Sequence, residues 1–293
     1  MNIEQLLILN QKDLYSYILK QIVGLPHTLL RDKWLVVNVD DTPKPMLCAH
    51  LDTVNGGHYN LSKDDIIQKD DIVSLLPTSK ARCLGGDDRC GVYIALKLIN
   101  DIKRGVVPQD KYSFGFFFDE EIGGVGSYDY STDERFKVEQ HTAFIGLDRR
   151  NAVIGKPEVA SYNYDSEELF TVFDAYQYDV GSFTDCAVLS EACNVACVNL
   201  SVGYNHEHTT KEYINQNDML FTYWQLREVV FSEDVYTYTD TYSKYHTSIE
   251  ADEIPCEVCG VHEKLYKVFD EECYDTLQVC ESCATFIHNE YNY

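Results

Sequence analysis

Side chains that commonly bind metal ions follow apolar runs at several points in the chain. Three consecutive acids, Asp119, Glu120 and Glu121, come directly after one such run and are followed by a glycine-rich stretch. Carboxylates side by side at the end of a buried strand are costly unless a cation neutralises them. His50 and Asp52 stand two residues apart after another run, where the Asp can hydrogen-bond a metal-binding imidazole. Taken alone, this second pair would also fit two polar residues that stand at the end of a strand by chance.

Three further segments supply side chains of the same kinds. Asp87 and Asp88 stand in a glycine-rich turn that leads into a predicted helix, and either could instead cap that helix. Asp148 ends the next apolar run, and His206 or His208 leads into a later helix. Together the five segments supply two His and at least three carboxylates at the carboxyl ends of predicted strands, where α/β sheets place their active sites. Such side chains are the nitrogen and oxygen ligands that zinc accepts.

The motifs AHLDTV, GGDDRCG, DEEIGGVGS, GLD and HTTKE, in this order, resemble those of the two-zinc (co-catalytic) exopeptidase superfamily. That superfamily includes peptidase T, acetylornithine deacetylase and single-domain aminopeptidases, and the resemblance covers residues 33–215. It implies two catalytic zinc ions, with Mn or Co as alternatives, held by His50 and Asp148 on one side, Glu121 and His208 on the other, and Asp87 as the bridge. Glu120 would be the general base, and Asp52 would orient His50. Because neighbours on an extended chain point in opposite directions, Glu120 cannot share the role of Glu121.

The same resemblance favours one residue in each ambiguous pair. The final His of the family precedes a Ser or Thr and then a Glu three or four residues on, which fits His208 and Glu212 better than His206. The bridging Asp of the family is followed two residues later by Lys or Arg and four residues later by Gly, which fits Asp87 rather than Asp88.

The spacing of the motifs also predicts the organisation and the reaction. Only sixty positions separate Asp148 from His208, and thirty-five separate Asp52 from Asp87, too few for the lid or dimerisation domain that many relatives insert. The chain therefore resembles the single-domain aminopeptidases, and we expect it to cleave a terminal amide bond of a small peptide. An amidase or deacylase of N-acyl amino acids or other small amides is the enzymatic alternative. A catalytically idle scaffold that binds a protein partner is the alternative of another class.

Four further cysteines form two CxxC pairs near the end of the chain: Cys256, Cys259, Cys280 and Cys283. Their spacing predicts a structural zinc ribbon, since a module of about forty residues needs such a staple to fold. Reduced or disulfide-paired thiols are the alternative. Residues 251–293 contain ten Asp and Glu against two Lys. We therefore expect this module to bind a protein partner or to stabilise the chain, and not to bind nucleic acid.

The elements that must position these residues alternate between strands and helices. Apolar runs predict strands at 33–39, 45–49, 111–118, 142–147 and 196–202, and helical periodicity predicts helices at 91–102 and 212–231. This order predicts an α/β catalytic domain over residues 1–232, with a central, mostly parallel (mixed) sheet flanked by helices and no lid. The polar segment 233–251 is predicted to be a linker, followed by the zinc-ribbon module at 252–293.

Composition limits the possible partners and the compartment. The chain carries 24 Lys and Arg against 48 Asp and Glu, a formal charge of −24, which repels phosphate backbones and anionic membranes. A general adaptation for solubility would explain the same balance. The N-terminus lacks a basic leader, and its pattern predicts an amphipathic helix whose inward residues are Leu6, Leu7, Leu9, Leu14 and Ile18. No segment approaches the ~20 apolar residues of a membrane span, so we expect a cytoplasmic protein.

Overall fold

The computed structural model describes residues 2–55, 60–151, 156–162, 164–165, 167–181 and 183–229, and the backbone of three short strands at 239–240, 265–270 and 275–280. The chain divides into two compact units, Met1–Thr239 and Asp240–Tyr293. In the second unit, β15 (Leu265–Asp270) and β16 (Asp275–Cys280) pair antiparallel. Cys256, Cys259 and Cys283 lie outside the described residues, and Cys280 is described by its backbone alone. The zinc ribbon therefore stays a prediction.

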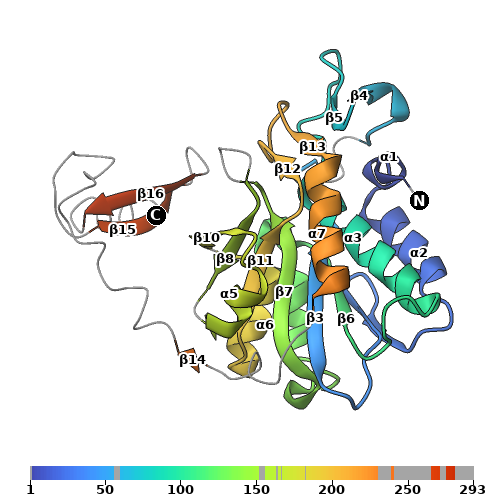
Figure 1. Cartoon of the computed structure of the whole chain (residues 1–293). Coiled ribbons are helices and arrows are strands. Elements are labelled where there is room, and N and C mark those ends of the chain that lie inside the picture. Colours follow the sequence, from blue (N-terminus) through green and yellow to red (C-terminus); the bar gives the residue numbers. More distant parts are fainter. Residues whose placement is uncertain are drawn as a thin grey trace. The chain divides into compact units, whose positions relative to one another are not determined.

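Eight strands form the central sheet of the first unit in the order β1-β2-β6-β3-β7-β11-β8-β10 (Figure 1). Their bounds are β1 His27–Leu30, β2 Trp34–Val37, β3 Lys44–His50, β6 Ser113–Phe117, β7 His141–Arg149, β8 Glu158–Ser161, β10 Gln177–Val180 and β11 Cys197–Ser201. The four central strands, β6, β3, β7 and β11, run parallel. The β1–β2 hairpin joins antiparallel to β6, and β8 runs antiparallel to β11. The predicted mixed sheet with a parallel centre is confirmed.

Helices cover both faces of this sheet (Figure 1). One face carries α1 (Ile3–Leu7), α2 (Gln11–Gln21), α3 (Gly86–Lys103), α5 (Glu167–Val172) and α7 (Gln216–Glu228), and the other carries α4 (Val125–Ser131) and α6 (Asp185–Cys193). The core alternates accordingly along the strands. On β3, Leu47 and Ala49 pack into the cluster of α3 and α7, whereas Met46 and Cys48 pack into the cluster of α6. This period of two is what a strand buried on both faces requires.

A second, four-stranded sheet has the order β12-β13-β5-β4, with β4 Ile66–Lys69, β5 Ile72–Leu75, β12 Tyr204–Asn205 and β13 Tyr213–Asn215. All of its described pairings are antiparallel. The predicted start of a helix at Glu212 was wrong, because residues 213–215 pair with β5 instead. Helix α7 begins only after Asn215, whose side chain accepts the backbone N–H of Asn217 and caps it.

The N-terminal helix is interrupted where one continuous helix was expected. Asn10 caps α2 by accepting the N–H of Asp13, and this ends the preceding turn. The predicted inward positions Leu6, Leu14 and Ile18 are fully buried, whereas Leu9 lies in the connection and is half-buried. Among the described helices, none is both long and apolar enough to cross a membrane.

Candidate metal centre

Parallel strands bring most of the candidate side chains to one edge of the sheet. His50 is the last residue of β3, Asp148 is the last residue but one of β7, and the acids at 119–121 follow β6 after one residue. Because β6, β3 and β7 are parallel neighbours, these ends meet at the same edge. Asp87 enters from the kinked first turn of α3, and His208 enters from the turn between β12 and β13.

The side chains form two groups that share Asp87. In the first group, His50 Nε2 lies 2.8 Å from Asp87 Oδ1 and 3.6 Å from Asp148 Oδ1. In the second, His208 Nε2 lies 3.1 Å from Asp87 Oδ2 and 3.1 Å from Glu121 Oε1. Within each group the potential ligand atoms all lie within 4.8 Å of one another. The two oxygens of one carboxylate therefore face two different imidazoles.

The two alternatives left open by the sequence occupy other positions. His206 is exposed, and its ring packs 5.9 Å from the ring of Tyr213. Asp88 turns away from both groups, because its Oδ2 accepts the N–H of His50 and its Oδ1 accepts the N–H of Gly91. Gly91 is needed there since α3 comes so close to β7 that a Cβ would lie 2.1 Å from the carbonyl oxygen of Leu147.

The electrostatics of the two groups fit a bound cation. Burial raises the pKa of Asp148 to about 7, and Asp87 adds to this rise. Burial likewise raises the pKa of Glu121. Burial alone would lower the pKa of His208, but its hydrogen bonds with Asp87 and Glu121 outweigh that effect and raise it to about 11. One buried and two largely buried carboxylates join two imidazoles in the mixed oxygen and nitrogen donor set that zinc accepts, so the residues fit this metal.

Asp52 holds three parts of the site together. Its Oδ1 lies 3.2 Å from His50 Nδ1 and accepts the N–H of Glu120 at 3.0 Å, while its Oδ2 accepts the N–H of Glu121 at 3.0 Å. Burial alone would raise the pKa of Asp52, but these hydrogen bonds lower it, so the carboxylate is ionised.

Glu120 and Glu121 lie in a turn of 3₁₀ helix, η2 (Glu120–Ile122), and not on the extended chain that the sequence suggested. Asp119 before it has a φ of 60°, and Gly123 after it has a φ of 105°. This turn still separates the two carboxylates: Glu121 belongs to the second ligand group, whereas Glu120 belongs to neither. Burial raises the pKa of Glu120 well above its usual value.

Three residues that the sequence did not identify as part of the site hold the candidate ligands in place, two of them through backbone groups and one through a carboxylate. Glu212, seen there only as part of a pattern, is fully buried and accepts the N–H groups of Gly85 and Asp87 at 2.8 and 3.1 Å. Asn199 Oδ1 accepts the N–H of Asp148, and its Nδ2 donates to the carbonyl of the same residue. The hydroxyl of Tyr204 donates to Asp148 Oδ1 at 3.1 Å. A lone amide inside the apolar strand at 197–201 was the available signal for Asn199.

Solved structures with the same fold include peptidases and a cyclase. The aminopeptidase PepT of Bacillus cereus is 13% identical, with a TM-score of 0.57 over 76% of this chain and 94% of that one. A tripeptidase of Staphylococcus aureus is 15% identical, with a TM-score of 0.56 over 77% and 95%. The glutaminyl cyclase of Porphyromonas gingivalis is 12% identical, with a TM-score of 0.50 over 76% and 93%. At these identities the likeness is one of fold.

Sequence comparison identifies the family more directly. No curated protein matches the chain. The profile of peptidase family M28, however, matches residues 38–251, which include every candidate ligand of the two groups and most of the chain. The expected relationship to the co-catalytic zinc exopeptidases is therefore confirmed, and the chain belongs to peptidase family M28.

Proposed function

We propose that the chain is a two-zinc aminopeptidase that removes the N-terminal residue of small peptides. Membership of its family makes it a zinc-dependent peptidase; the number of ions, their ligands and the bond cleaved are the proposal. The observation that carries it is the position of Asp87, whose Oδ1 lies 2.8 Å from His50 Nε2 and whose Oδ2 lies 3.1 Å from His208 Nε2. A carboxylate in this position can serve two metal ions at once.

The proposed ligands follow from the two groups. His50 and Asp148 would hold one ion, Glu121 and His208 the other, and Asp87 both. When bound, the ions would supply Lewis-acid polarisation of the scissile carbonyl and lower the pKa of the attacking water.

Glu120 is the proposed general base. Its carboxylate would take the proton from water and deliver it to the leaving nitrogen. Burial supports this role, since a raised pKa lets the carboxyl group hold that proton between the two steps. The position of Glu120 depends on Asp52, which accepts its backbone N–H.

Metal content of single-site variants tests the shared ligand. Asp87→Asn should abolish tight binding of both ions, whereas Asp148→Asn should weaken only one, because only Asp87 belongs to both groups. Asp64→Asn, an exposed acid outside the site, is the matched control. Loss of one ion alone in Asp87→Asn would contradict the bridging role.

A panel of small amides tests the reaction. We expect release of the first residue from peptides and aminoacyl amides with a free amine, and no turnover of the same compounds after N-acetylation. Preference for the N-acyl compounds would identify a deacylase instead. Full metal content without turnover of any compound would support the scaffold alternative.

We also propose a structural zinc at the four C-terminal cysteines, and the boundaries 1–232, 233–251 and 252–293, on the sequence pattern alone. Four thiolates at this spacing form a closed tetrahedral site. Elemental analysis should then give three metals per chain, of which Cys256→Ser removes one. Retention of all three metals in that variant would contradict the ribbon.

A further inference from the structure

The N-terminal helices precede the family match, which begins at residue 38. They and their connection nevertheless contact two turns of the candidate metal centre: the segment after β3 that ends in Asp52, and the turn η2 that contains Glu120. The first contact runs through Arg89, which is 3% exposed. Its Nη1 donates to the carbonyl oxygens of Leu51 and Asp52 at 3.0 and 3.2 Å, and its Nη2 donates to the carbonyl of Leu9 at 3.1 Å. One guanidinium therefore joins the connection between α1 and α2 to the segment that ends in Asp52.

Arg89 suits this position because its donors are fixed in one plane. Burial lowers its pKa to about 10, which leaves the group charged at neutral pH, and the carboxylate of Asp52 opposes that decrease. A lysine ammonium is a compact point charge on a flexible stem and cannot reproduce the planar fork.

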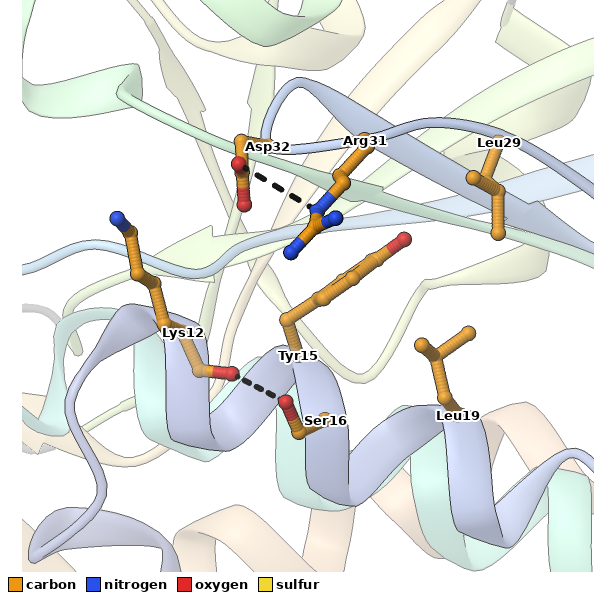
Figure 2. Close-up of a pocket in the computed structure, with 7 residues that line it drawn as sticks. All are labelled: Lys12, Tyr15, Ser16, Leu19, Leu29, Arg31 and Asp32. Atoms are coloured by element: carbon orange, nitrogen blue, oxygen red, sulfur yellow. Dashed lines mark hydrogen bonds and ion pairs between the residues drawn. The ribbon is translucent and has the colours of Figure 1, made fainter.

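The second contact reaches the turn that contains Glu120. Gln11, the first residue of α2, donates its side-chain amide to Asp119 Oδ1 at 3.1 Å. One turn further along α2, Tyr15 extends between the helix and the β1–β2 hairpin (Figure 2). The centroid of its ring lies 5.3 Å from that of Phe118, in an edge-to-face arrangement. The helix thus contacts the two residues that immediately precede Glu120.

We propose that Arg89 and Gln11 are positioning residues that anchor the two turns of the metal centre to the N-terminal helices. Arg89 acts through the backbone of Asp52, which in turn holds His50 and the amides of η2. Gln11 acts through Asp119 on the turn that carries Glu120. Residues 2–22 are then part of the catalytic unit. The kinetic test of this inference rests on the proposed function.

Kinetics of Arg89→Lys, Arg89→Met and Gln11→Leu in the full chain test this inference. Two variants are the matched controls. Arg104→Met changes an arginine at the opposite end of α3, where 67% of the side chain is exposed. Gln68→Leu removes a local amide hydrogen bond on exposed β4. We expect kcat to fall about 10-fold to 100-fold in both Arg89 variants, since misplacement by about 1 Å can cost that much, with KM little changed. Gln11→Leu should lower kcat less, and the controls should match the wild type.

Titration with Co²⁺, followed by visible absorption, supplies a readout that is independent of turnover. The Arg89 variants should change the Co²⁺ spectrum and weaken binding, because Asp52 orients His50. Gln11→Leu should change the spectrum less than the Arg89 variants, because Gln11 contacts only Asp119, which belongs to neither ligand group.

The outcomes separate this inference from the proposed function. Wild-type kcat in folded Arg89→Lys and in Gln11→Leu would overturn it. If Arg89→Met fails to fold, Arg89→Lys and Gln11→Leu decide. If the wild type cleaves no peptide at all, the proposed function fails, and the Co²⁺ spectrum of Arg89→Lys alone then decides: a changed spectrum supports the positioning role, and an unchanged one refutes it.

Discussion

Replacing Asp52 with Asn tests the centre of the hydrogen-bond network most directly. The amides of Glu120 and Glu121 donate to different oxygens of Asp52, and the ring of His50 shares Oδ1. An Asn side chain has only one oxygen. In either orientation its NH₂ group must therefore face one backbone N–H, two donors in contact. With the oxygen in the Oδ1 position, the contacts of Glu120 and His50 survive and the amide of Glu121 loses its acceptor.

The expected magnitude follows from that single loss. A buried donor left without an acceptor costs about 1–3 kcal/mol, which corresponds to about 5-fold to 150-fold in an equilibrium constant. Because Glu121 is a proposed ligand, we expect the cost to appear in metal affinity. This agrees with the 10–100-fold losses typical of residues that orient metal ligands.

Competition with a chelator measures that affinity, and urea unfolding of the metal-free protein measures the stability. Asp70→Asn is a suitable control because Asp70 is exposed and has a φ of 54°, a conformation that Asn tolerates. Wild-type affinity for both ions together with an unchanged unfolding midpoint in Asp52→Asn would refute the reasoning.

Three substitutions and one truncation test other parts of the account. Glu120→Gln should keep both metals and lose about 10²–10⁴-fold in turnover, the scale of general base catalysis, whereas Glu121→Gln should lose metal and recover in part with excess zinc; normal turnover in Glu120→Gln would exclude it as the base. Burial lowers the pKa of His141 to about 4, and neither ring nitrogen has a hydrogen-bond partner among the described residues. Below the pKa of about 6.5 that this histidine has in the unfolded chain, the unfolded chain binds a proton that the folded chain excludes. Between pH 7.5 and pH 5 the wild type should therefore lose about 2 kcal/mol of unfolding free energy relative to His141→Phe. Parallel urea titrations of the two proteins measure this difference, and equal losses would contradict it. Truncation near residue 240, the boundary between the two compact units, should leave a folded and partly active first unit, and aggregation of that fragment, seen by size-exclusion chromatography, would show that the C-terminal residues belong to its core.

The sequence predicted those parts of the site that depend on local pattern. Two of the parallel central strands, β3 and β7, are apolar runs that lead into a candidate ligand, so His50 and Asp148 could be placed at one edge without knowing the fold. The second sheet was missed because its strands are two to four residues long and its central pair, β5 and β13, joins segments more than a hundred positions apart. The role of Glu212 was missed for the same reason, since its backbone partner Asp87 is 125 positions away in the chain.

The residues missed in this way share one structural role, which is to fix the main chain of the candidate ligands. Glu212 accepts the N–H of Asp87, and Asn199 binds both the N–H and the carbonyl of Asp148. Asp52, which the sequence did place at the site, accepts the N–H of Glu121 in the same way. Asn199 takes the place of ladder hydrogen bonds where the register between β7 and β11 shifts. A ligand whose backbone is fixed loses little further entropy when its carboxylate turns toward a cation. Substitutions at these supporting residues should therefore weaken metal binding less than substitution of a ligand itself.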